Sequence, residues 1–285
     1  MLRKLLVVVG LAALVATVAL AGDFVPFFER TGDIKDLVIG DPGCWSVFDE
    51  CLPDGQHAGD GFGIRLVGAI LTLRPDYGLG VVPTTWGSVA QDVVAGAFDT
   101  TFSPVFITPE RDELADFVPY ACFSTVSAVV RVGEVRFGSS DELQPARVAT
   151  VTGYATDEWL RTNGYSAVTR YADQSLALKA LLTGAVDVLM IDLRSALDEI
   201  ALQAVSSLVE VRFEALAGYA PGGFIVNPAD PAFKEFLGAH VRALAGAGVL
   251  QQIAKETGAV EVLAAFKTFE QYAAGAPVEL PDCGQ

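Results

Sequence analysis

The chain has 285 residues, of which 52% are hydrophobic, and this is enough for two domains of ordinary size, each with its own core. Its formal net charge of −16 repels nucleic acid and anionic membrane surfaces. The expected partner is therefore a small molecule or another protein, and neither a nucleic-acid-binding nor a disordered chain is expected.

The first 21 residues have the pattern of a secretory signal peptide. Arg3 and Lys4 precede an uninterrupted apolar run, which ends in an A-x-A cleavage pattern before Gly22. We expect the mature chain to begin near Gly22 and to be exported to the periplasm. An uncleaved membrane anchor is the alternative, because the apolar run is long for a signal and short for a membrane span.

The four cysteines are Cys44, Cys51, Cys122 and Cys283, and they lack the paired spacing of a zinc site. An exported chain meets an oxidising compartment, so disulfides are the better interpretation. Three pairings are possible, and we favour Cys44 with Cys51 because their loop is short, which leaves Cys122 for Cys283. We expect neither a bound metal nor a cofactor.

Strands and helices alternate in the first part of the chain, where strands are predicted over 35–40, 77–83 and 100–107 and helices over 64–71 and 88–97. The loop after the first strand contains Trp45, which is a candidate wall of a ligand pocket. The alternative is that this ring only packs beneath its own loop.

Arg111 follows the strand predicted over 100–107 and lies in the first turn of a helix. Thr108 suits the N-cap, Pro109 suits the first helical position, and Glu110 complements the positive end of the helix dipole. A cation gains nothing there from the dipole. Because open α/β sheets bind ligands at the carboxyl ends of their strands, Arg111 is predicted to hold an anionic group of a small molecule.

The pattern repeats later in the chain, with strands predicted over 126–132, 148–151, 167–171 and 186–191. The hydroxyl-rich turn from Thr152 to Asp157 opens a helix and is a second place suited to an anion. Asp192 follows the last of these strands directly, at its carboxyl end.

Two segments are predicted to cross between two lobes, at about 122–125 and at about 217–221. These crossings make the first lobe discontinuous, with residues 22–122 and 222–285, and insert residues 126–216 as the second lobe. Such an architecture closes around a ligand in the cleft. The fold class is therefore α/β, with a mostly parallel central sheet flanked by helices in each lobe.

Five segments together resemble the solute-binding proteins of polar amino acid ABC transporters, which have the type II periplasmic binding fold. They cover most of the mature chain in the family's order: VPTTWGSVAQDVVAGAFD, ITPERDELADFVPY, GYATDEWLRTNG, LLTGAVDVLMIDL and GGFIVNPADPAFKEFLGAHVRALAGAGVLQQIAKE. The resemblance implies a monomeric, extracytoplasmic protein that is not an enzyme. It would capture a small carboxylated solute, in particular an amino acid, and deliver it to an ABC permease.

The resemblance also implies ligand-binding residues. Arg111 would bind the α-carboxylate and Asp192 the α-ammonium group of the ligand. The other positions implied are Trp45, Ser103 and, from the turn that also holds the carboxylate, Thr152, Tyr154, Thr156 and Asp157. Phe106 replaces a hydroxyl that is usual in the family, and the side-chain pocket is therefore expected to be more apolar and aromatic.

Two alternative functions share this fold. The first is a periplasmic cyclohexadienyl dehydratase, which acts on prephenate or arogenate; such enzymes have an acid where this chain has Ser195 and a lysine where it has Thr125. The second is a ligand sensor that has lost transport. Fold alone does not separate these functions.

Overall fold

The structure is a computed structural model that describes residues 35–42, 45, 47–48, 59–74, 77–124, 126–214, 219–266, 271–272 and 274–283. The predicted signal peptide, the cysteines Cys44 and Cys51, and Thr125 lie outside the described residues. None of the helices within the described ranges is both long and apolar enough to cross a lipid bilayer.

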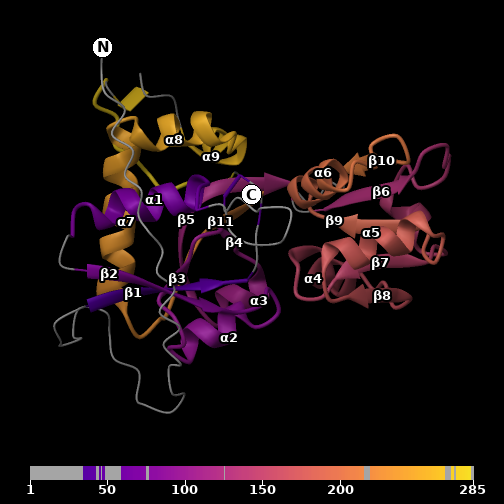
Figure 1. Ribbon diagram of the computed structural model, residues 1–285, viewed down its shortest axis with the longest axis horizontal. Coiled ribbons are helices and arrows are strands. Elements are labelled where there is room, and N and C mark those ends of the chain that lie inside the picture. Colours follow the sequence, from indigo (N-terminus) through magenta and orange to yellow (C-terminus); the bar gives the residue numbers. More distant parts are fainter. Residues whose placement is uncertain are drawn as a thin grey trace.

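The elements form two lobes that lie side by side in Figure 1. Lobe 1 contains the strands β1 (Lys35–Asp41), β2 (Tyr77–Pro83), β3 (Thr100–Thr101), β4 (Val105–Phe106), β5 (Asp116–Ser124) and β11 (Tyr219–Val226). Its helices are α1 (Phe62–Leu71), α2 (Val89–Val94), α3 (Pro109–Asp112), α7 (Pro231–Gly246), α8 (Val249–Thr257) and α9 (Val260–Ala265).

Lobe 2 is built around one five-stranded sheet. Its strands are β6 (Ser127–Arg131), β7 (Val148–Val151), β8 (Val168–Tyr171), β9 (Val188–Ile191) and β10 (Val209–Glu214), in the order β10-β6-β9-β7-β8. Strand β7 pairs with β8 and β9 in parallel, whereas β6 pairs with β9 and β10 in antiparallel. The helices are α4 (Ala155–Thr162), α5 (Gln174–Leu182) and α6 (Leu193–Leu202).

Burial on both faces explains the sequence of the central strands of lobe 2. In β9, Leu189 and Ile191 belong to one hydrophobic cluster, whereas Val188 and Met190 belong to another on the opposite face. Successive side chains of a strand point to opposite faces, so a strand covered on both sides is apolar throughout. The continuous run VLMI therefore becomes a central strand, and its carboxyl end places Asp192 at one edge of the sheet.

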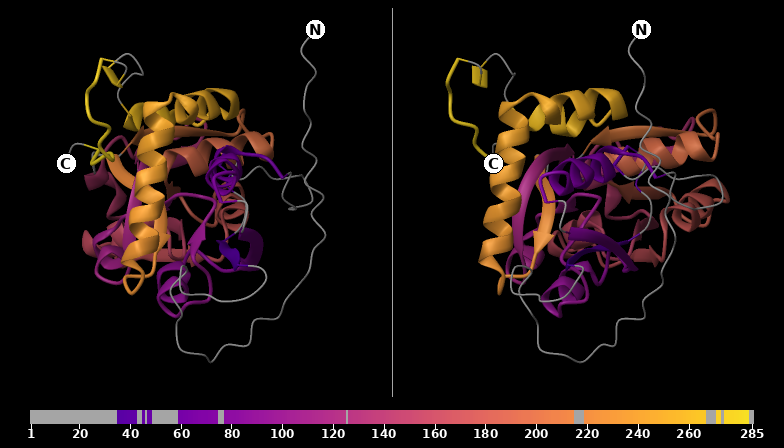
Figure 2. Two further views of the ribbon diagram at one scale, coloured as in Figure 1. Left: turned by 90° about the vertical axis from the view of Figure 1, so that its left-hand side faces the viewer. Right: turned by 60° about the vertical axis from the view of Figure 1, so that its left-hand side comes forward.

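Lobe 1 contains two small sheets, with the orders β2-β1-β3 and β4-β11-β5. Strands β2 and β3 pair with β1 in parallel, and β11 runs antiparallel to both β4 and β5. Helix α7 packs along β5, as the turned views in Figure 2 show. Strands β5 and β11 pair from Tyr219 opposite Ser124 onward, so the chain leaves lobe 1 and returns to it through neighbouring strands.

The prediction of a single strand over 100–107 is wrong, because the structure divides this segment into two strands. Strand β3 ends at Thr101 and pairs with β1, while β4 begins at Val105 and pairs with β11. Pro104 lies in the break, where it has no ladder hydrogen bond to donate. The break turns the segment from one sheet to the other before it reaches Arg111.

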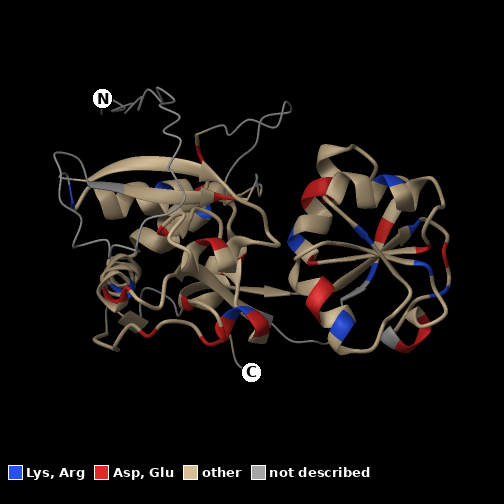
Figure 3. Ribbon diagram, turned by 90° about the horizontal axis from the view of Figure 1, so that it is seen from below, with Lys and Arg blue, Asp and Glu red and all other residues tan. Residues whose placement is uncertain are grey.

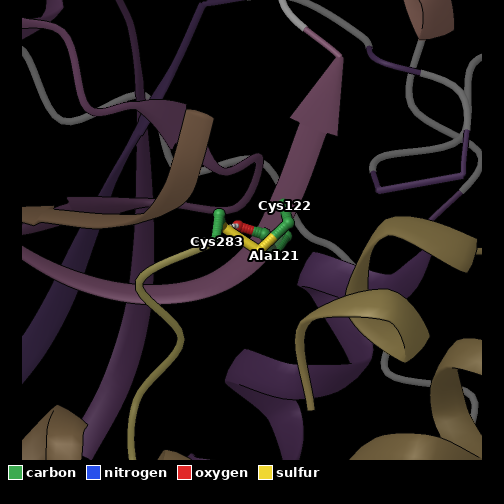
Figure 4. The surroundings of a disulfide bond; sticks show 3 residues. All are labelled: Ala121, Cys122 and Cys283. Carbon is green, nitrogen blue, oxygen red and sulfur yellow. Dashed lines mark hydrogen bonds between the residues drawn. A yellow bond between two sulfur atoms is a disulfide. The ribbon is translucent and has the colours of Figure 1, made fainter. Parts of the chain in front are cut away.

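The predicted disulfide between Cys122 and Cys283 is present, and it ties the C-terminal segment to β5 (Figure 4). Acidic residues are spread over both lobes, as the view from below shows (Figure 3).

Candidate functional site

A small cavity lies where the two lobes meet. Its lining comes from both lobes and comprises Trp45, Trp86, Phe106, Arg111, Tyr154, Ala155, Asp192 and Ser195. The cavity has a volume of about 10 Å³, which is room for about one water molecule. In this arrangement of the lobes, the side chains therefore leave no room for a larger ligand.

Arg111 reaches this cavity from the short helix α3. The Thr108 side chain caps the helix by accepting a hydrogen bond from the Arg111 backbone N–H at 3.3 Å. The guanidinium donates to three carbonyl oxygens: Phe106 at 3.1 Å, Trp86 at 3.2 Å and Gly153 at 2.7 Å. No carboxylate among the described residues forms a salt bridge with it, although its side chain is buried.

The electrostatic state of Arg111 follows from this burial. Loss of solvent lowers the pKa of Arg111 to about 10, while the negative charges of Glu158 and Glu110 act in the opposite direction. The guanidinium stays charged at neutral pH. A buried cation that is bonded only to neutral carbonyl groups is suited to bind an anion.

Asp192 faces the same cavity from lobe 2. It is the N-cap of α6, and its Oδ1 accepts a hydrogen bond from the Ser195 backbone N–H at 2.8 Å. Burial raises the pKa of Asp192 to about 6, although the hydrogen bonds from Ser195 lower it. No cation within the described ranges pairs with this carboxylate. It is therefore suited to bind a positively charged group.

Four aromatic rings form most of the remaining wall. Trp45 lies 5.7 Å from Trp86 with an interplanar angle of 80°, and 5.7 Å from Phe106 with an angle of 57°. Trp86 in turn meets Tyr154 of lobe 2 edge-on at 6.1 Å. Trp45 was predicted either to line a pocket or to pack beneath its loop. Its ring lines the cavity and also packs against Phe48 of the same loop at 5.2 Å and against Phe123 of β5 at 5.1 Å.

Tyr154 connects the aromatic wall to the polar groups of lobe 2. Its hydroxyl donates to Oε1 of Gln174 at 3.3 Å. Burial raises the pKa of Tyr154, and the charges of Asp192, Glu199 and Asp173 raise it further. The phenol therefore stays neutral and can act only as a neutral hydrogen-bonding group in the cavity.

The other predicted ligand-binding residues lie outside the lining of this cavity. Asp157 is buried and forms an ion pair with Arg170, with 2.7 Å between Oδ1 and Nε. Thr156 and Ser103 are also buried, whereas Thr152 is exposed. Five residues of the predicted set thus meet at the cavity: Arg111, Asp192, Trp45, Phe106 and Tyr154. The other four do not line it: Ser103, Thr152, Thr156 and Asp157.

Three lining residues, Trp86, Ala155 and Ser195, were not among the predicted ligand-binding residues. Trp86 follows β2, and Ser195 lies in the first turn of α6 after β9. Both therefore lie just beyond the carboxyl ends of parallel strands, the position used to identify Asp192. Applying that criterion to every such strand would have found them.

Direct contacts between the lobes surround the cavity. On one side, Arg161 of α4 pairs with Glu110 of α3 at 2.7 Å. On another, Arg194 of α6 pairs with Glu261 of α9 at 2.8 Å, and both side chains are largely buried. Gly153 lies so close to lobe 1 that a Cβ added to it would be 2.4 Å from the Cα of Gly87.

The described residues contain no group of three or more His, Cys, Asp or Glu side chains that could hold a metal ion. The chemistry of the cavity is that of one buried guanidinium, one buried carboxylate, two hydroxyl groups and aromatic rings.

Comparisons with known proteins identify relatives of this chain. Residues 52–258 match the bacterial extracellular solute-binding proteins, family 3. A cyclohexadienyl dehydratase from Pseudomonas aeruginosa is 26% identical over 242 residues, which are 84% of this chain and 80% of the relative.

Solved structures share the fold at lower identity. An ancestral arginine-binding protein bound to arginine has a TM-score of 0.69 at 21% identity, covering 79% of this chain and 99% of that one. A substrate-binding protein of an ABC uptake transporter from Streptococcus pneumoniae, with bound histidine, has a TM-score of 0.70 at 18% identity, covering 80% and 94%. The predicted two-lobed fold is confirmed by these similarities.

Proposed function

We infer the function from the family: this chain belongs to the bacterial extracellular solute-binding proteins, family 3, and we propose that it captures a small carboxylated solute in the cavity between its lobes. Among such solutes, we propose an amino acid. We further propose that the loaded protein delivers it to an ABC permease.

One observation carries the proposal. Arg111 from lobe 1 and Asp192 from lobe 2 line the same cavity, both are buried, and neither is paired with an opposite charge in the described part of the chain. Burying unpaired charges is costly, and a ligand that brings both opposite charges offsets both costs at once. An α-amino acid has this charge pair, with its carboxylate for Arg111 and its ammonium group for Asp192.

Binding is coupled to movement of the lobes in this proposal. The carboxylate site and the ammonium site lie on different lobes, so only the closed form satisfies both ends of the ligand. The two crossings, at about 122–125 and 217–221, would act as hinges between lobe 1 (22–122 and 222–285) and lobe 2 (126–216). The two hinges lie near the ends of the neighbouring strands β5 and β11.

The cellular setting is part of the proposal. Residues 1–21 would direct export and be removed near Gly22, so that the mature protein works as a periplasmic monomer. The wall residues that touch ligand would include Trp45, Phe106 and Tyr154, which line the cavity. The contributions of Ser103, Thr152, Thr156 and Asp157 would be indirect, through the loops that hold Arg111 and the turn before α4.

The test is the affinity of an Arg111→Ala variant. A thermal-shift screen of the mature protein against amino acids, keto acids and small dicarboxylates first identifies a ligand, and titration calorimetry then gives its Kd. Replacing Arg111 should weaken binding by about 2–5 kcal/mol, because the ligand's carboxylate would be buried unpaired. Arg111→Lys keeps the charge but loses the planar fork, and we expect an intermediate loss.

Arg136→Ala is the matched control, because Arg136 is exposed and pairs with Glu134 at the surface of lobe 2. It should bind like the parent chain. If Arg111→Ala folds and also binds like the parent, the proposed site is wrong.

A second candidate function is supported by the dehydratase relative from Pseudomonas aeruginosa. Such an elimination needs a proton donor beside the substrate. Asp192 is the one carboxyl group among the described residues that line this cavity. Ser195 stands where that enzyme class has an acid. Incubation with prephenate and with arogenate, followed by ultraviolet detection of aromatic product, separates the two functions. We expect no turnover; formation of product would establish the enzyme instead.

A further inference from the structure

The polar side-chain groups of the cavity are few, and the proposed amino acid head group uses its two charged groups and one of its hydroxyls. Arg111 would take the carboxylate, and Asp192 with the hydroxyl of Ser195 would take the ammonium group. Tyr154 contributes one more hydroxyl, which already donates to Gln174. No other charged or amide side chain is among the lining residues within the described part of the chain.

The backbone adds little to this inventory. Phe106 and Trp86 line the cavity, and their carbonyl oxygens already accept hydrogen bonds from Arg111, at 3.1 and 3.2 Å. Each of these oxygens therefore has one remaining lone pair for a donor of the ligand. An amide, an ammonium or a carboxylate group needs more partners than these two acceptors supply.

What remains for the ligand's side chain is a wall of aromatic rings, in which the indole Nε1 of Trp45 is a buried donor without a hydrogen-bond partner among the described residues. Trp45, Trp86 and Phe106 come from lobe 1, and the ring of Tyr154 closes the wall from lobe 2. Trp45 and Phe106 are further supported from behind by Phe123, at 5.1 and 4.8 Å between ring centroids. The packing of Phe123 therefore holds the rings of Trp45 and Phe106 in place.

We propose that this site selects an amino acid with an apolar side chain, aromatic or branched aliphatic, and rejects amino acids whose side chains are amides or carry charge. The inference rests on the proposed function, because it assigns the side-chain end of the ligand whose head group is held by Arg111 and Asp192. Phe106 is the specificity-determining residue on the lobe 1 side.

The physical reason is the free energy lost when a polar group of the ligand is buried without hydrogen-bond partners. A side-chain amide, carboxylate or amine that is buried between the lobes leaves water and finds aromatic rings in its place, and the one indole N–H of Trp45 cannot satisfy all of its hydrogen bonds. On the scale of protein mutational data, such a loss weakens binding by about 5- to 150-fold. An aromatic side chain suffers no such loss and gains edge-to-face contacts with the wall.

The experiment is a calorimetric titration of the mature protein with five L-amino acids: phenylalanine, leucine, glutamine, glutamate and lysine. We expect phenylalanine and leucine to bind at least about tenfold more tightly than the other three. If glutamine, glutamate or lysine binds as tightly as the better of the two apolar ligands, the inference is wrong while the proposed function stands. If none of the five binds, the inference is wrong, and the thermal-shift screen with other amino acids, keto acids and dicarboxylates decides the proposed function.

Phe106→Ser tests the wall itself, because it places a hydroxyl where the ring was. The ratio of the phenylalanine Kd to the glutamine Kd should rise at least about tenfold, since an apolar partner is lost and a hydrogen-bonding one is gained. Phe224→Leu is the matched control: Phe224 is a buried ring of lobe 1 that packs on Tyr120 at 4.9 Å and does not line the cavity, so the ratio should stay near that of the parent. An unchanged ratio in a folded Phe106→Ser variant would overturn the role of Phe106, and the amino acid panel on the parent chain decides the ligand class whether or not that variant folds.

Discussion

Arg111 of lobe 1 donates a hydrogen bond from Nη2 to the carbonyl oxygen of Gly153 in lobe 2, with 2.7 Å between the two atoms. The group proposed to hold the ligand's carboxylate is thus also one that joins the lobes. A ligand carboxylate would share the guanidinium with this carbonyl, or displace it. Binding and closure therefore depend on the same side chain.

Gly153→Ala should hinder closure. Gly153 has φ of +80°, which disfavours any residue with a Cβ, and that Cβ would lie 2.4 Å from the Cα of Gly87 across the lobe interface. We expect a larger radius of gyration by small-angle X-ray scattering in the presence of ligand, and a Kd at least about tenfold weaker, equivalent to about 1.4 kcal/mol.

Gly164→Ala provides a matched control for this prediction. Gly164 has φ of +78°, but no atom lies within 4 Å of the position that its Cβ would take. Gly164→Ala should lower the melting temperature about as much as Gly153→Ala, because both place a Cβ at a positive φ, but it should leave ligand affinity unchanged. Equal losses of affinity in the two variants would mean that the effect comes from backbone strain and not from the lobe interface.

The pKa of Asp192, raised to about 6 by burial, predicts how stability changes with pH. An aspartate in the unfolded chain titrates near its usual pKa of about 4, so between about pH 4 and pH 6 the folded state keeps a proton that the unfolded state has lost. The free energy of unfolding should therefore fall as pH rises through this window, by about 3 kcal/mol from this group. Chemical unfolding at pH 4, 5, 6 and 7 measures it, and Asp192→Asn should remove this part of the slope.

Ligand affinity should depend on the same carboxyl group. Above pH 6, Asp192 is ionised and attracts an ammonium group, so amino acid binding should strengthen between pH 5 and pH 7. Tyr154 beside it stays neutral over this range, because burial raises its pKa. The corresponding 2-keto acid, which has no amine, should not gain affinity. Equal gains for the amino acid and the keto acid would contradict the assignment of Asp192 to the ammonium group.

The ion pair between Arg194 and Glu261 should stabilise the closed form. The two side chains come from different lobes, are largely buried and lie 2.8 Å apart. A double-mutant cycle with Arg194→Ala and Glu261→Ala should give a coupling of about 1–3 kcal/mol in ligand affinity.

A pair within lobe 2 serves as the control for this cycle. Arg147 and Asp187 form an ion pair at 2.7 Å, but they belong to one lobe. Their cycle should leave ligand affinity unchanged, because the pair does not contribute to closure. If the Arg194–Glu261 cycle shows coupling only in thermal unfolding and none in affinity, the pair is structural and does not act on closure.

The disulfide between Cys122 and Cys283 should contribute strongly to stability, because it closes a long loop. The two cysteines are 161 residues apart, and in the chain-entropy model a loop of that length corresponds to about 5 kcal/mol. The double variant Cys122→Ser, Cys283→Ser should unfold at clearly lower denaturant concentration than the parent, whereas adding a reductant should change the double variant little. A midpoint equal to that of the parent would contradict this.

Much of the site was predictable from local patterns. Thr108 is the helix cap that its position before Pro109 predicted, and Arg111 follows it in the first turn. Asp192 follows a fully apolar strand and caps the next helix. These positions depend on residues only a few places apart, so the local sequence is sufficient to predict them.

Other features depend on contacts between distant segments and could not be predicted in this way. Four residues of the turn from Thr152 to Asp157 were expected to bind the ligand: Thr152, Tyr154, Thr156 and Asp157. In the structure Tyr154 lines the cavity, whereas Asp157 turns away to Arg170, which comes from another strand. Which side of a turn faces a cleft depends on the partners that the neighbouring strands provide.

The sequence by itself determined the alternation of strands and helices, the helix caps and the two charged residues at the ends of buried strands, because hydrophobic periodicity and capping act over a few residues. Only the tertiary structure decided that Arg111 and Asp192 share one cavity, that Trp86 completes its wall, and that Gly153 meets Gly87. These relationships depend on how closely two separately formed lobes approach each other, and that distance is set by side chains that are remote in the sequence.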